Sequence, residues 1–135
     1  MTTPWNSGAV PVGEPVQQLA LQAATPVAGF ALGASGFETI ATWTAPNDGQ
    51  LHRALIMGGM QVTSATTGGQ VTLKVASPGD SAVATYVIFG ISQAGGDYAF
   101  PVFFLPVKAG TSVTVLQATG ISAGAALVWT EIWGS

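Results

Sequence analysis

Between residues 37 and 133, hydrophobic and polar residues alternate in short runs that turn residues separate. The clearest run covers residues 70–77, where three aliphatic residues (Val71, Leu73 and Val75) alternate with polar ones. A period of two places successive side chains on opposite faces of a β-strand. Comparable runs cover residues 37–44, 53–63, 85–91, 98–105, 112–118 and 127–133. We therefore predict about seven strands and little helix.

The segments between these runs have the composition of tight turns. Pro46-Asn-Asp-Gly49, Pro78-Gly-Asp80 and the Gly-rich residues 94–97 contain residues that accept turn geometry, and glycine also accepts positive φ. Many short connections favour antiparallel neighbours in an all-β domain. For residues 36–135 we predict an antiparallel β-sandwich, jelly-roll-like in its topology.

Residues 1–35 differ in composition from the rest of the chain. Four prolines and several glycines are spread through them, and proline lacks the amide hydrogen that a sheet requires. We predict an extended N-terminal arm that becomes ordered against another surface, with a disordered tail as the alternative. The apolar anchors of this arm would be Trp5, Val16, Leu19 and Leu21.

The chain has few charges for its size, which changes what its surface can do. Charged residues make up 7% of the 135, against about 25% in an ordinary soluble domain. The net charge of −3 and three scattered cations argue against binding nucleic acid through phosphates. The densest apolar run, residues 98–107, holds two prolines and is too short for a membrane span. We expect other protein chains to cover much of this surface.

The candidate chemistry is sparse. The chain has no cysteine and one histidine, His52, with Asp48 four residues before it, and no Gly-x-Ser-x-Gly motif accompanies them. Asp48, Asp80 and Asp97 lie in glycine-rich turns, where side-chain hydrogen bonds to the backbone explain them. A calcium site built from these loops is the alternative. We predict no catalytic residue, no metal and no cofactor.

The aromatic residues carry more information. Trp129 and Trp133 lie four residues apart on one predicted strand and therefore share a face. They could fill the core, stack on a sugar, or contact another subunit. We assign to an oligomer interface five aromatic residues: Phe100, Phe103, Phe104, Trp129 and Trp133.

Two longer segments suggest a family. Thr42-Trp-Thr-Ala-Pro-Asn-Asp-Gly49 and Val107-Lys-Ala-Gly-Thr-Ser-Val-Thr-Val115 follow a Pro/Gly-rich arm and precede a last strand that ends near residue 133. This combination resembles the small β-sandwich virion proteins of tailed bacteriophages, and is broadly similar to the trimeric jelly rolls of the C1q and tumour-necrosis-factor type.

The resemblance implies a structural protein without catalytic residues. In such a role the chain would form a homotrimer on the capsid surface and hold neighbouring major capsid subunits together, as a head decoration (cement) protein. The alternative is a minor tail or fibre-tip module that binds a host-surface glycan through Trp129, Trp133 or Tyr98.

Overall fold

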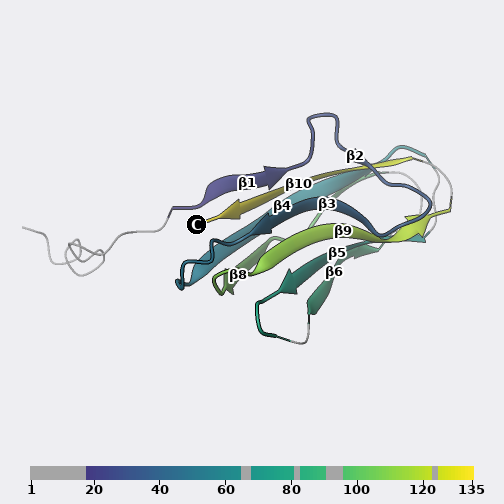
Figure 1. The fold of residues 1–135 in the computed structure, drawn as a ribbon. Helices are drawn as coiled ribbons and strands as arrows, with labels where there is room; N and C mark the ends of the chain where they lie inside the picture. Colours follow the sequence, from purple (N-terminus) through teal and green to yellow (C-terminus); the bar gives the residue numbers. More distant parts are fainter. Residues whose placement is uncertain (1–17, 65–67, 81–82, 91–95, 123–124) are drawn as a thin grey trace, which may run out of the picture.

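The computed structural model describes residues 18–64, 68–80, 83–90, 96–122 and 125–135 (Figure 1). In these ranges no helix is long and apolar enough to cross a membrane. The strands are β1 (Ala20–Ala24), β2 (Phe30–Ala31), β3 (Glu38–Thr44), β4 (His52–Val62), β5 (Gly68–Ala76), β6 (Ala84–Gly90), β7 (Gly96–Ala99), β8 (Phe103–Val107), β9 (Ser112–Ile121) and β10 (Ala126–Gly134).

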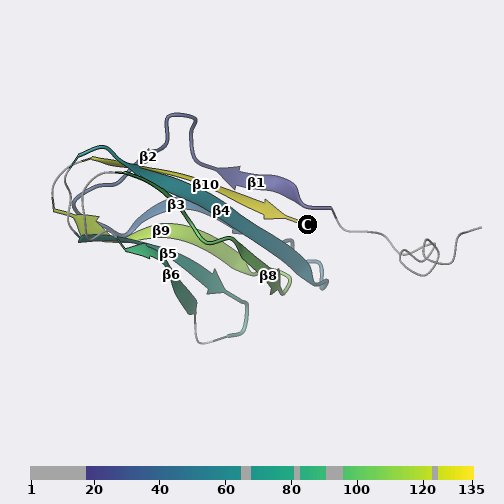
Figure 2. The same cartoon turned by 180° about the vertical axis from the view of Figure 1, so that it is seen from behind.

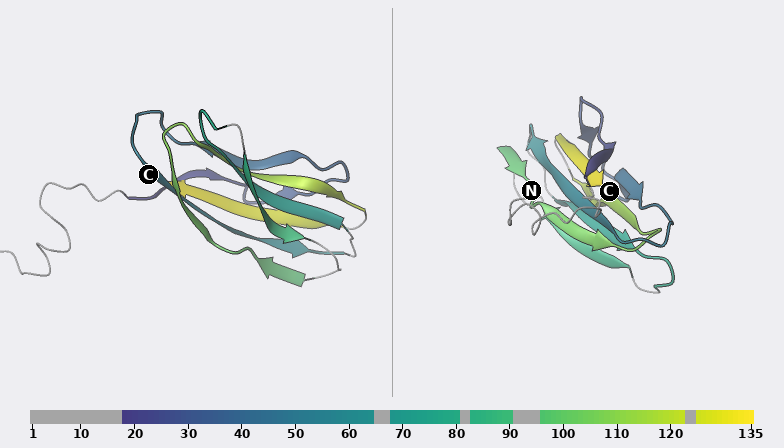
Figure 3. Two further views of the ribbon diagram at one scale, coloured as in Figure 1. Left: turned by 90° about the horizontal axis from the view of Figure 1, so that it is seen from below. Right: turned by 90° about the vertical axis from the view of Figure 1, so that its left-hand side faces the viewer.

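The strands form two antiparallel sheets. The six-stranded sheet has the order β1-β10-β4-β7, with β2 also paired to β10 and β8 also paired to β4. The four-stranded sheet has the order β3-β9-β5-β6. Figures 1 and 2 show the fold from opposite sides, and Figure 3 shows it from below and roughly along the strands. The predicted all-β antiparallel sandwich is confirmed.

The core lies between the two sheets and follows the alternation of the sequence. In β10, Val128, Thr130 and Ile132 are buried, and the residues between them are half-exposed. In β5, Val71 and Leu73 are fully buried, as their period-two spacing predicts. Burial of one such aliphatic side chain stabilises the fold by roughly 1.5–3 kcal/mol.

Part of the predicted arm belongs to the sandwich itself. β1 pairs with β10 from Ala20 opposite Gly134 to Ala24 opposite Glu131, and β2 pairs with the other end of β10. β1 contains no proline and lies at the sheet edge, where one side of its backbone needs no partner. β1 and β2 therefore belong to the sheet of their own chain, whereas the sequence predicted an arm over residues 1–35. Trp5 and Val16 lie outside the described residues.

Candidate functional site

A row of large apolar side chains crosses the outer face of the six-stranded sheet. Leu21 of β1 lies opposite Trp133 of β10, Trp133 opposite Leu55 of β4, and Leu55 opposite Phe104 of β8. Residues directly opposite in an antiparallel sheet point to the same face. Leu21 is 48% exposed and Phe104 is 53% exposed, whereas Leu55 and Trp133 are half-buried. The row is therefore an apolar strip on the molecular surface.

Neighbouring rows extend the strip. Trp129 lies opposite Gly59, Leu127 opposite Gln61, and Met57 opposite Glu131. We call this surface the apolar face, defined by Leu21, Leu55, Met57, Phe104, Leu127, Trp129 and Trp133. Among the described residues, the register places three charged side chains on the same face: Arg53, Asp97 and Glu131.

The outer face of the four-stranded sheet is different in kind. The hydroxyls of Thr42 and Thr114 lie 2.9 Å apart, as do those of Thr44 and Ser112. Lys74 stands beside Thr114 and is exposed. Antiparallel sheets commonly carry such polar residues on a face that meets water. These hydroxyls distinguish this face from the apolar strip of the six-stranded sheet, although Val87 and Leu116 also lie on it, opposite Thr72.

One edge of the sandwich is also apolar. β6 ends the four-stranded sheet, while β7 and β8 end the six-stranded sheet. Tyr86 of β6 and Phe103 of β8 bring their ring centroids to 6.0 Å, which links the two edges. The large exposed hydrophobic residues at or beside this edge are Val83, Tyr86, Val87, Val102 and Phe104.

The structure brings together most of the aromatic residues assigned to an interface. Phe104, Trp129 and Trp133 lie on the apolar face, together with Leu21, which the sequence placed in the arm. Phe103 is half-buried and packs against the core. Leu19, just before β1, is half-buried as well.

Phe100 requires a correction. Its side chain is 6% exposed and belongs to the core, where its ring lies 6.1 Å from that of Phe89. The run from 98 to 105 is two strands instead of one, because it is broken around Pro101. Phe100 keeps the inward direction of Tyr98, which lies opposite the buried Met60, and the change of face after the break turns Phe104 outward.

Leu55, Met57 and Arg53 were not singled out from the sequence. All three lie on β4 at a spacing of two, within the predicted strand 53–63. The spacing of two in the sequence predicts that the three side chains share one face of the strand. The sequence does not show which strands lie beside it.

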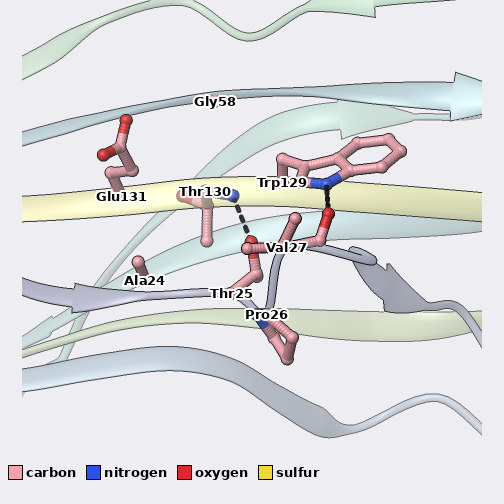
Figure 4. Close-up of a pocket in the computed structure, with 8 residues that line it drawn as sticks. All are labelled: Ala24, Thr25, Pro26, Val27, Gly58, Trp129, Thr130 and Glu131. Atoms are coloured by element: carbon pink, nitrogen blue, oxygen red, sulfur yellow. Dashed lines mark hydrogen bonds between the residues drawn. The ribbon is translucent and has the colours of Figure 1, made fainter.

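A pocket of about 210 Å³ opens beside the apolar face, where the chain leaves β1. Figure 4 shows its lining, with Trp129 and Glu131 on either side of Thr130 and the segment 24–27 alongside. The indole Nε1 of Trp129 donates to the Val27 carbonyl at 3.0 Å. The backbone amide of Thr130 donates to the Thr25 hydroxyl at 3.2 Å. These two hydrogen bonds hold residues 24–27 against β10, and these residues form one wall of the pocket.

The buried ring of His52 and the exposed carboxylate of Asp48 form a hydrogen-bonded pair at the opposite end of β4. Nε2 of His52 lies 2.8 Å from Oδ1 of Asp48, and Nδ1 lies 2.6 Å from the main-chain oxygen of Ser135. The hydrogen bonds with Asp48 and then with Ser135 raise the pKa of His52, although burial opposes them. The hydrogen bonds from His52 and from the Gln50 amide lower the pKa of Asp48. Because both ring nitrogens are engaged, neither is available as a general base in this arrangement.

Asp48 and Asp80 lie in turns as predicted, whereas Asp97 lies in strand β7 opposite Gln61. Asp48 accepts from the amide of Gln50 at 3.0 Å, which is the predicted bond within a turn. Asp80 lies 3.8 Å from Nζ of Lys108 in an exposed ion pair. Within the described ranges, no three His, Cys, Asp or Glu residues are grouped so that they could hold a metal ion.

Searches against family models, curated proteins and solved structures each found no match.

Proposed function

We propose that this protein is a structural protein of a tailed-bacteriophage virion: a head decoration protein that trimerises on the capsid surface and stabilises contacts between major capsid subunits. The observation that carries the proposal is the apolar face. A sandwich that presents hydroxyls on one side and Leu21, Trp133, Leu55 and Phe104 in one row on the other has one side suited to water and one suited to protein.

The composition of that face supports contact with protein. Contiguous exposed apolar patches on soluble proteins mark interaction sites, and interface centres are rich in aromatic residues and methionine. Two tryptophans, a phenylalanine and a methionine lie on this face, within a chain of which charged residues are 7%. Self-association would remove the exposed apolar area from water.

The strand order supports the jelly-roll part of the proposal. The orders β1-β10-β4-β7 and β3-β9-β5-β6 are compatible with the two Greek keys of a jelly roll. Because Leu21 belongs to β1 and the apolar face, the proposal assigns it to contacts between subunits. Contact with the capsid is assigned to the residues that precede β1, including Trp5, Val16 and Leu19.

The experiment that tests decoration removes residues 1–17 and measures binding to undecorated capsids by co-sedimentation. The truncated chain keeps every described strand, so we expect an unchanged circular dichroism spectrum and loss of capsid binding. The full chain with Thr114→Ser on the hydroxyl face is the control and should bind normally. Binding of the truncated chain at the full-length level would refute the role of this segment. A lack of density for the chain on capsids imaged by cryo-electron microscopy would refute decoration itself.

The pocket favours one second function, a tail or fibre-tip module that binds glycan. An indole beside a carboxylate and a hydroxyl offers stacking and hydrogen bonding together, as sugar recognition requires. Tyr98 is less suited to stacking, because its ring packs 5.1 Å from that of Phe89. Glycan-array binding that disappears in Trp129→Ala and persists in Trp43→Phe would favour this function over decoration.

A further inference from the structure

The apolar face carries a cation and an anion that do not meet within the chain. Arg53 is exposed on β4 and Glu131 is half-exposed on β10, and neither takes part in an ion pair among the described residues. Glu131 lies opposite Met57, four residues along β4 from Arg53. That spacing corresponds to roughly 13 Å along the strand. The row formed by Leu55 and Trp133 lies between the two charges.

The pocket beside Glu131 is suited to a planar cation. Its lining contains Glu131 and Trp129, which lie two residues apart on β10, together with the segment 24–27 (Figure 4). A guanidinium group pairs with carboxylates in a fixed planar geometry and also stacks on aromatic rings. Arg53 is the single arginine of the sequence.

We propose that a second copy of this chain docks on the apolar face with its Arg53 guanidinium in the pocket, between Glu131 and Trp129 of the first copy. This inference rests on the self-association in the proposed function and specifies its contacts. Because every copy carries both the arginine and the pocket on one face, a closed cyclic assembly can satisfy both in each subunit. In a homotrimer, each arginine would enter the pocket of the next subunit.

In this docked arrangement, the apolar row and the two charges contribute differently to association. The row Leu21, Trp133, Leu55 and Phe104 lies beside the two charged positions, so docking through them also covers apolar surface. Apolar burial supplies the driving force, and the paired charges set the orientation. A basic peptide or a small cation would neutralise Glu131 but leave most of the row exposed.

Asp97 is the other anion on this face, and it provides a matched control. It lies on β7 opposite Gln61, is exposed, and does not line the pocket. Reversal of its charge changes the net charge of the face by the same amount as reversal of Glu131. If association depends only on the net charge of the face, both variants should weaken it equally. If Glu131 forms a specific pair, only reversal of Glu131 should weaken association.

The experiment is a charge swap in the full chain, with the assembly measured by sedimentation velocity over a range of concentrations. We expect the wild type to associate, and Arg53→Glu and Glu131→Arg each to weaken association by about tenfold or more. The double variant Arg53→Glu/Glu131→Arg should recover association to within about threefold of the wild type, and Asp97→Arg should change it by less than about threefold. Arg53→Gln and Glu131→Gln, with circular dichroism of every variant, guard against loss of folding.

Several results would overturn the inference. A wild type that stays monomeric at all concentrations, or single reversals without effect, would contradict it. Failure of the double variant to recover would also contradict the pairing of these two residues. Binding of agmatine or of an oligosaccharide in the pocket without association would assign the pocket to a soluble ligand. Capsid binding measured separately shows whether decoration stands or fails independently of this pair.

Discussion

At the scale of single residues, His52 connects a loop to the last strand. Its two ring nitrogens contact Asp48 and the main chain of Ser135, and its side chain is almost fully buried. The ionised Asp48 carboxylate and the Ser135 main-chain oxygen are both hydrogen-bond acceptors. The imidazolium form of His52, which carries a proton on each ring nitrogen, can donate to both. The charge on one ring therefore influences how tightly the 45–51 loop and Ser135 are held.

This arrangement predicts a pH-dependent stability. The raised pKa of His52 stabilises the fold fully below about pH 6.5, and this contribution disappears as the pH rises through the folded-state pKa. The lowered pKa of Asp48 stabilises the fold fully above about pH 3.8, and this contribution is lost as the pH falls through the folded-state pKa. The melting temperature should therefore be highest between these two pH values. It should fall at higher pH as His52 loses its proton, and at lower pH as Asp48 gains one.

His52→Gln should remove the fall in melting temperature on the alkaline side, with Asp80→Asn as a control that leaves the fall in place. The chain has one histidine, so a single imidazole titration followed by NMR reports directly on this ring. A pH dependence that is identical in the wild type and in His52→Gln would show that another group is responsible.

At the scale of elements, the connection between β1 and β2 depends on one glycine. Gly29 has a φ of +85°, its amide donates to the Pro26 carbonyl, and an added Cβ would lie 2.9 Å from the ring of Trp129. Gly79 has a φ of +79° but open space around it. The two glycines share a backbone requirement and differ in their neighbours.

Gly29→Ala should therefore destabilise the protein more than Gly79→Ala. Each substitution incurs the left-handed backbone cost of about 1–2 kcal/mol, and Gly29→Ala adds a clash that displaces the indole. Unfolding in denaturant measures both free energies. Equal losses in the two variants would mean that the indole does not support this connection.

Comparison of the predicted runs with the observed strands shows which strands can be predicted from the alternation of neighbouring residues. The runs 85–91, 112–118 and 127–133 correspond closely to β6, β9 and β10, because alternation is a property of neighbouring residues. β1 was not predicted, because its sequence, Ala-Leu-Gln-Ala-Ala, does not alternate between hydrophobic and polar residues. Its pairing with β10 is visible only in the structure. Trp129 and Trp133 were placed on one face correctly. Their neighbours Leu55 and Leu21 depend on register across strands, which the sequence does not display.

At the scale of the whole molecule, the contrast between the two outer faces predicts how a new charge will act. A carboxylate on the apolar face would oppose association, because it would be buried without a partner. The same group on the hydroxyl face would stay in water. Each face has a suitable position in a central strand: Leu55 of β4 on the apolar face, and Thr114 of β9 on the hydroxyl face.

Leu55→Asp should therefore reduce the assembly to monomers, while Thr114→Asp should leave its mass unchanged. Light scattering after size exclusion measures the mass, and circular dichroism checks the fold of each variant. Dissociation by Thr114→Asp alone would move the interface to the four-stranded sheet and would contradict the proposed role of the apolar face.

The position of β10 also has a consequence for synthesis of the chain. This strand lies inside its sheet, between β1 and β4, and contributes Val128 and Ile132 to the core. While the ribosome is still translating it, β1 has no partner and β4 lacks one neighbour. The six-stranded sheet can therefore close only after residue 134 has left the ribosome exit tunnel. Until then, apolar surface of the nascent chain is open to chaperones and to neighbouring nascent chains.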